Sequence, residues 1–227
     1  MSIFIKIILA VSLGVAAACA VAKSSPNITD ISDLPPVATP ENASPAANGP
    51  QKAVFAGGCF WGLDAVFKHV KGVTKVTSGY SGGTKETADY ETVSTGKTGH
   101  AESVEVTFDP AKVTYQQLLY VFFAVAHDPT ELNYQGPDHG TQYRSVIFFT
   151  SDEQKKTAED FIAAIDKSKA LSKPVVTQVV PFQTFYPAED YHQNYLALHP
   201  DEPYIVYNDK PKVAALKEKF PNLYTER

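Results

Sequence analysis

Cysteine is nearly absent from this chain of 227 residues, which holds only Cys19 and Cys59. Two cysteines cannot build the disulfide framework of a small secreted scaffold. The cysteines and the six histidines also lack close pairs such as Cys-x-x-Cys or His-x-x-x-His, so we predict no metal site. Basic residues are not in excess, because the formal net charge is −5, and we therefore predict no nucleic-acid partner.

A long hydrophobic run occurs at the N-terminus, where the uncharged stretch Ile7–Ala22 follows Lys6. It is shorter than the roughly 20 residues that span a bilayer. It ends in small residues that fit a secretory cleavage site. We predict that residues 1–22 are a signal peptide and that the protein is exported to the periplasm or another extracytoplasmic space.

Two other outcomes stay open for this segment. It can remain as a membrane anchor, or it can be a lipoprotein signal in which Cys19 is lipidated after cleavage. Ala-Ala-Ala-Cys resembles such a processing site, although Ala16 stands where Leu is usual. Lipidated Cys19 would tether the protein to the membrane.

Residues 23–50 contain six prolines and no aromatic residue. Such a composition buries too little apolar surface to fold, so we predict a disordered Pro/Ser/Ala-rich tether. A catalytic domain at residues 51–199 is expected to follow, and then a C-terminal tail at 200–227 with one short helix after Pro211.

Strand and helix patterns alternate within the domain. Period-2 or buried apolar runs predict strands at 52–56, 73–80, 102–108, 144–150 and 175–180. Helical spacing and capping residues predict helices at 60–70, 114–127, 151–169 and 188–198. This order favours an α/β or α+β fold with helices packed on a mixed sheet.

Cys59 lies at a strand-to-helix turn, in the run Gly57-Gly58-Cys59-Phe60-Trp61-Gly62. At a helix N-terminus the free N–H groups and the helix dipole favour an anion, so we expect a lowered pKa and an accessible, nucleophilic sulfur. The alternative is a buried, inert cysteine, as most free cysteines are.

The sequence resembles the methionine sulfoxide reductase A family at this hexapeptide and at four later motifs in the same order. They are Gly79–Gly83, Tyr90–Glu102, Asp138–Ser145 and Phe185–Gln193. The resemblance covers roughly residues 52–198. It implies a two-layer α/β sandwich with a mixed sheet, packed helices and a ferredoxin-like core.

The resemblance also implies an activity, the reduction of methionine S-sulfoxide to methionine in oxidised proteins or as the free amino acid. Cys59 would attack through a sulfenic acid intermediate, and Glu102 would be the acid, which requires that burial raise its pKa. Taken alone, Glu102 would be expected on an exposed strand face. The residues implied for substrate binding are Phe60, Trp61, Tyr90, Asp138 and Tyr143.

Two departures from the family pattern stand out. Tyr134 occupies a position where Arg is common, and the tail lacks the further cysteines that recycle many members. We therefore expect no cofactor, but an external reductant such as thioredoxin or a small thiol. Two other functions stay open: a different Cys–Glu enzyme, such as a thiol hydrolase or transferase, and a non-catalytic exported lipoprotein that acts as a binding module.

Overall fold

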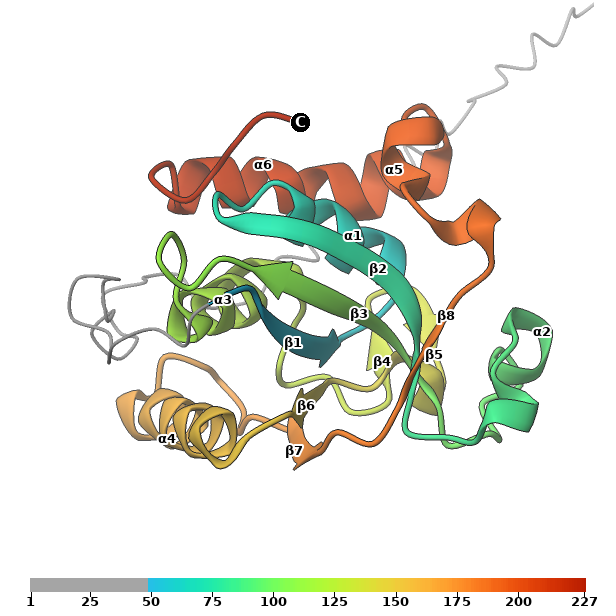
Figure 1. The fold of residues 1–227 in the computed structure, drawn as a ribbon, viewed down its shortest axis with the longest axis horizontal. Coiled ribbons are helices and arrows are strands. Elements are labelled where there is room, and N and C mark those ends of the chain that lie inside the picture. Colours follow the sequence, from blue (N-terminus) through green and yellow to red (C-terminus); the bar gives the residue numbers. More distant parts are fainter. Residues whose placement is uncertain (1–48) are drawn as a thin grey trace, which may run out of the picture.

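The computed structural model describes residues 49–227. The predicted signal peptide and nearly all of the predicted tether lie outside the described residues. The described part is built on a six-stranded sheet of order β7-β6-β1-β3-β2-β8, with a separate two-stranded hairpin, β4-β5 (Figure 1). The strands are β1 (Gln51–Ala56), β2 (Val73–Ser81), β3 (Ala101–Phe108), β4 (Tyr134–Gln135), β5 (Asp138–His139), β6 (Val146–Phe149), β7 (Gln178–Pro181) and β8 (Phe185–Pro187).

Helical segments connect these strands. The α-helices are α1 (Phe60–Lys68), α2 (Tyr90–Val93), α3 (Tyr115–Val121), α4 (Asp152–Ser168), α5 (Tyr195–Leu198) and α6 (Lys210–Lys219). Two π-helical turns, η4 (Phe122–Ala126) and η7 (Ile205–Asp209), and three 3-10 turns, η3 (Lys85–Thr87), η5 (Thr141–Tyr143) and η6 (Asp190–His192), complete the chain.

The central four strands form the predicted ferredoxin-like core. In the order β6-β1-β3-β2 all neighbours are antiparallel, with α1 connecting β1 to β2 and α3 lying between β3 and β6. β7 adds to one edge in parallel and β8 to the other in antiparallel fashion, which makes the sheet mixed. The predicted α/β fold with packed helices is confirmed.

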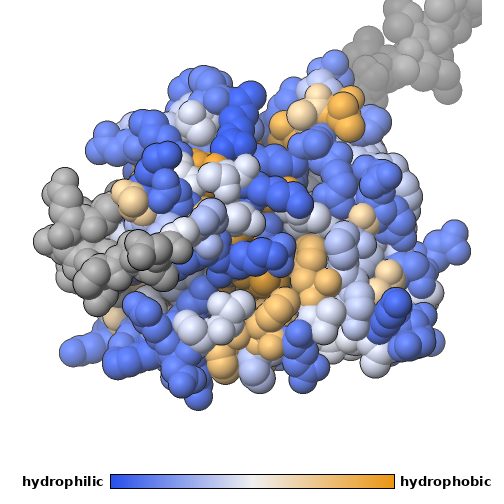
Figure 2. All heavy atoms as spheres, in the orientation of Figure 1, coloured by the Kyte–Doolittle hydropathy of each residue, from blue (hydrophilic) through white to orange (hydrophobic). Residues whose placement is uncertain are grey.

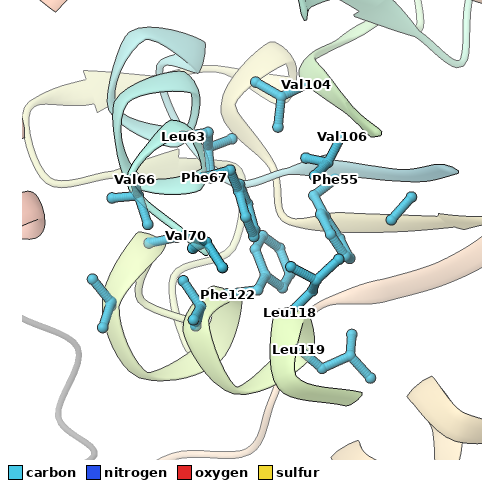
Figure 3. Close-up of a cluster of buried hydrophobic side chains, with 14 of the residues drawn as sticks. Phe55, Leu63, Val66, Phe67, Val70, Val104, Val106, Leu118, Leu119 and Phe122 are labelled. Atoms are coloured by element: carbon cyan, nitrogen blue, oxygen red, sulfur yellow. The ribbon is translucent and has the colours of Figure 1, made fainter. Parts of the chain in front are cut away.

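The main core lies between the sheet and the helices α1 and α3 (Figure 3). Phe55 of β1 stacks on Phe67 of α1 at 5.2 Å and on Phe122 at 4.9 Å between ring centroids. Val104 and Val106 of β3 are fully buried, as their alternation predicted. These contacts fix α1, and with it the residue that precedes α1, against the sheet.

A smaller cluster, made of Val54, Ala56, Ala101, Val146 and Phe148, forms a second buried group. The surface seen in the orientation of Figure 1 is largely hydrophilic, with hydrophobic residues gathered in small groups (Figure 2). None of the helices in the part of the chain that the structure describes is long and apolar enough to cross a membrane.

The predicted helix at 188–198 is wrong. The chain forms strand β8 just before it, Ala188 donates its backbone N–H to Ser78 O at 2.9 Å, and α5 begins only at Tyr195. Asn194 has a left-handed backbone, with φ of 57°, which interrupts any helix through this segment. The segment therefore leaves the edge of the sheet at Ala188 and forms only the short turns η6 and α5 on either side of Asn194. The predicted helix at 114–127 also changes type, because it is α-helical only to Val121 and continues as the π-helical turn η4.

The C-terminal tail is packed onto the domain. The helix predicted after Pro211 begins one residue earlier, as α6, and runs beside α1 (Figure 1). The turn η7 leads into it and also contacts α1. The residues from 200 onward are thus next to the helix that Cys59 precedes.

Candidate active site

Cys59 is the N-cap residue of α1 and follows β1 through the turn Gly57-Gly58. Gly58 has φ of +90°, and a Cβ there would lie 2.8 Å from Cβ of Gln135, so only glycine fits. Its backbone N–H donates to Tyr143 O at 3.1 Å. The turn before the cysteine therefore packs against the hairpin β4-β5 and the turn η5.

The Cys59 side chain is buried, with 8% of its surface exposed, which contradicts the expected accessibility. The expected lowering of its pKa is also wrong. Burial raises the Cys59 pKa well above its usual range, and the carboxylates of Glu102, Asp209 and Asp138 raise it further, while the backbone N–H of Trp61 acts in the opposite direction. Desolvation thus outweighs the helix N-terminus, and the resting site holds a thiol.

Glu102 lies in β3 where that strand passes the turn before Cys59. Ala56 pairs with Ser103, so the preceding residue of β3 reaches the start of α1. The Glu102 carboxyl is 2% exposed and accepts a hydrogen bond at Oε2 from the backbone N–H of Phe60 at 3.1 Å. Burial raises its pKa to about 8, against the lowering effect of that bond, so the predicted rise is confirmed. A carboxyl of this kind is mostly protonated at neutral pH.

Phe60 and Trp61 contribute two aromatic surfaces next to Cys59. Phe60 is fully buried, with its ring 4.9 Å from that of His192. Trp61 is half-buried, stacks on Tyr195 at 3.6 Å with an interplanar angle of 3°, and donates its indole N–H to Nδ1 of His192 at 3.1 Å. The indole is therefore held by the segment around α5, which the sequence failed to predict.

The phenols of Tyr90 and Tyr143 both interact with the ionisable groups of Glu102 and Cys59. Burial raises the pKa of both phenols, and the Glu102 carboxylate and Cys59 raise them further, so both hydroxyls are donors at neutral pH. Tyr90 is the first residue of α2, and its backbone N–H donates to Glu189 Oε1 at 2.9 Å.

Asp138 begins the short strand β5. Its Oδ2 accepts a hydrogen bond from the Tyr204 hydroxyl at 2.5 Å, and burial raises its pKa. Its charge acts on both Cys59 and Glu102. The structure thus gathers the other six predicted site residues around the buried thiol of Cys59.

Several residues of this site escaped the sequence analysis as functional residues. Tyr195, Tyr204 and Asp209 come from the C-terminal segment, where no cysteine, histidine pair or glycine-rich motif pointed to them. His192 and Gln193, which end the motif at 185–193, brace the site by hydrogen bonds. His192 accepts from Trp61, and the amide of Gln193 bonds to the backbone N–H and C=O of Ser78.

Tyr134, the position that departs from the family pattern, lies in the hairpin β4-β5. Its ring stacks on His139 at 5.5 Å, and the next residue, Gln135, packs against Gly58. Among the residues that the structure describes, no group of three or more His, Cys, Asp or Glu side chains could hold a metal ion.

Comparison with known proteins agrees with this geometry. Residues 51–224 match the family model described as peptide methionine sulfoxide reductase. The chain belongs to that family. The match includes the predicted domain and most of the tail. The chain is therefore an oxidoreductase, as the resemblance of its motifs implied.

Individual reductases of the family are similar over nearly their whole length. "Peptide methionine sulfoxide reductase MsrA 2" of Mesorhizobium japonicum is 62% identical over 80% of this chain and 93% of its own. The protein of the same name from Synechocystis sp. is 50% identical over 83% of this chain and 85% of its own.

Two solved structures share the fold. Mxr1 of Saccharomyces cerevisiae in its reduced form has a TM-score of 0.62 at 33% identity, and covers 69% of this chain and 89% of its own. Methionine sulfoxide reductase A of Corynebacterium diphtheriae has a TM-score of 0.58 at 32% identity, and covers 70% of this chain and 79% of its own.

Proposed function

We propose that this reductase converts methionine S-sulfoxide to methionine, in oxidised proteins and as the free amino acid, with Cys59 as the nucleophile and Glu102 as the acid. One observation carries the assignment of roles. The buried Glu102 carboxyl, with a pKa of about 8, is hydrogen-bonded to the first backbone N–H after Cys59. A protonated carboxyl and a thiol at one helix start are the two groups that sulfoxide reduction needs.

The step balances with the groups present. Glu102 protonates the sulfoxide oxygen while the Cys59 sulfur attacks the sulfoxide sulfur, and the thiol proton of Cys59 restores Glu102. The attack forms an S–S bond between Cys59 and the substrate, and the S–O bond breaks as Glu102 passes on this second proton and the oxygen leaves as water. A water molecule then attacks the Cys59 sulfur, which breaks the S–S bond, releases methionine, leaves a sulfenic acid on Cys59 and returns a proton to Glu102. The methionine sulfur gains two electrons and the cysteine sulfur loses two.

The remaining groups orient the substrate. The hydroxyls of Tyr90 and Tyr143 donate hydrogen bonds to the sulfoxide oxygen, which supports the charge that develops there. Phe60 and Trp61 provide the apolar wall for the methyl group. Asp138, fixed by the Tyr204 hydroxyl, binds polar groups of the substrate.

Recycling requires a thiol from outside the domain. Cys59 is the one free cysteine of the described residues, and Cys19 is the only other cysteine of the chain. A small thiol or a thioredoxin-like dithiol protein condenses with the sulfenic acid, and a second thiol releases Cys59. For an exported enzyme, lipidated through Cys19 or freed by cleavage after residue 22, this reductant must act outside the cytoplasm.

A stereochemical assay tests the assignment. The wild-type protein should reduce the S epimer of peptide-bound methionine sulfoxide and leave the R epimer, whereas Cys59→Ser should show no reduction while remaining folded by circular dichroism. Reduction by Cys59→Ser within a few-fold of wild type would refute the role of Cys59. Hydrolysis of an ester substrate with no sulfoxide reduction would favour the thiol hydrolase instead, and the intact mass of the native mature protein settles the fate of Cys19.

A further inference from the structure

The C-terminal segment places a second buried carboxyl against the helix that Cys59 precedes. Asp209 ends the π-helical turn η7 and is fully buried. Neither of its carboxylate oxygens has a hydrogen-bond partner in the described part of the chain. Its charged neighbour is Lys212 on α6, with Nζ 3.5 Å from Oδ1 and 15% of the side chain exposed.

An ordinary structural role does not account for this placement. Asp209 stands at the start of α6, but its side chain makes no capping hydrogen bond there. Burying a carboxylate with one loosely paired cation is costly, because the lost hydration is poorly replaced. Single-turn π-helical segments such as η7 are frequent at functional sites.

The pair touches the first turn of α1. A Cβ built on Gly62 would lie 2.4 Å from Asp209 Oδ1 and 2.8 Å from Lys212 Nζ. Gly62 is three residues after Cys59, so the carboxylate and the ammonium group lie directly against the turn whose N–H groups face the sulfur. The glycine that closes the Gly-Cys-Phe-Trp-Gly run is required in this chain because the pair occupies the space of a side chain.

We propose that Asp209, paired with Lys212, is a positioning residue of the reductase, whose buried charge against the first turn of α1 tunes the reactivity of the Cys59 sulfur. This inference rests on the proposed role of Cys59 as the nucleophile. A tail without cysteines thereby still serves the reaction, because its negative charge favours the protonated sulfur in the resting enzyme. A protonated thiol resists the oxidants that convert free thiolates to sulfenic acid.

Electrostatics around the sulfur agree with the contacts. Burial raises the Cys59 pKa most, the charge of Glu102 is the second cause, and the charge of Asp209 is the third. Burial raises the pKa of Asp209 itself to about 6, against the lowering effect of Lys212. Asp209 is therefore mostly ionised at neutral pH. The other ionisable groups that interact with Cys59 or Asp209 are Glu102, Asp138, Lys212, Tyr90, Tyr143, Tyr195 and Tyr204.

The test is the pH profile of Cys59 alkylation by iodoacetamide, measured on the Cys59 peptide by mass spectrometry. Asp209→Asn removes the negative charge and leaves Lys212, so its profile should move to lower pH and its rate at pH 7 should rise at least about threefold. Asp209→Asn with Lys212→Met removes both charges, and its profile should fall between those of Asp209→Asn and wild type. Neutral replacement of a buried ion pair commonly leaves a protein folded, so the double variant decides if the single variant does not fold.

The matched control is Asp160→Asn, which removes the carboxylate of an exposed pair with Lys156 on α4 and should leave the profile unchanged. Coincident profiles of the folded Asp209 variants and wild type would overturn the proposal. The readout is independent of sulfoxide reduction. A failure of the proposed function would instead show as a Cys59→Ser protein that still reduces sulfoxide.

Discussion

At the scale of single residues, Glu102 is the proposed acid that protonates the sulfoxide oxygen. Glu102→Gln keeps the shape and the hydrogen bond from Phe60 but cannot donate a carboxylic proton. Losing general acid catalysis costs on the order of 10²–10⁴ in rate, and we expect a loss in that range for the sulfoxide-reduction step. In the wild type the contribution of Glu102 should decline as pH rises through about 8, where its carboxyl ionises.

Single-turnover kinetics without reductant measures this step apart from recycling. In Glu102→Gln the single-turnover rate should be lower than in the wild type and should no longer change with pH near 8. An unchanged single-turnover rate in Glu102→Gln would show that another group protonates the sulfoxide oxygen.

Sequence reasoning pointed to Cys59 through its position at a helix start, whereas Glu102 was assigned only through the resemblance to the family. It was wrong about the environment of Cys59, because a helix-start position indicates local dipoles but not burial or distant charges. Asp209 and Asp138 lie 150 and 79 residues away along the chain, and both act on the sulfur. These two charges come near the sulfur only when the hairpin β4-β5 and the tail pack around the start of α1, which no local pattern indicates.

At the scale of elements, the contact between α1 and the C-terminal segment makes a prediction about Gly62. Replacing glycine by alanine inside a helix usually stabilises by about 1 kcal/mol. Here the new methyl group would meet the buried Asp209 carboxylate at 2.4 Å, so Gly62→Ala should instead lower the free energy of unfolding by about 1–3 kcal/mol. Denaturant unfolding of the purified variant measures the sign directly.

The control is the same substitution in an Asp209→Ala background, where the obstructing carboxylate is gone. Most of the destabilisation should disappear there, because two residues in contact do not contribute additively. Equal losses in the two backgrounds would mean that Gly62 is needed for another reason.

The elements themselves were predictable to different degrees. α1 and β3 carry clear periodicity and stand close to where the sequence placed them. The segment 188–198 also has helical character, yet Ala188 is bonded to β2 and Asn194 has a left-handed backbone, so only η6 and α5 are helical there. Local propensity is a weak constraint there, because a free sheet edge offers backbone hydrogen bonds to whichever segment passes it.

At the scale of the whole molecule, the buried acids link stability to pH. The Glu102 pKa is raised from 4.5 to about 8 on folding. Its contribution to stability is therefore fully present below about pH 4.5 and is lost as pH rises through 8. Burial lowers the pKa of His127 to about 4, which acts in the opposite sense between about pH 4 and 6.5.

Comparing wild type with Glu102→Gln isolates the acid, because His127 is common to both. The variant should gain stability relative to wild type between pH 5 and 8, by on the order of 3–5 kcal/mol. Urea unfolding at several pH values measures this difference. A constant difference across that range would mean that Glu102 is not buried in its neutral form.

At the same scale, the proposed cycle depends on external thiols, because Cys59 is the one cysteine among the residues that the structure describes. The central claim is that Cys59 alone reduces the substrate and that an external thiol resolves the product. One measurement tests this most directly: the reduced protein is mixed with excess methionine S-sulfoxide and no reductant, and product and enzyme are then analysed by mass spectrometry. The account predicts one methionine per enzyme and a dimedone-reactive sulfenic acid on Cys59, whereas sustained turnover, or a Cys19–Cys59 disulfide in place of the sulfenic acid, would contradict it.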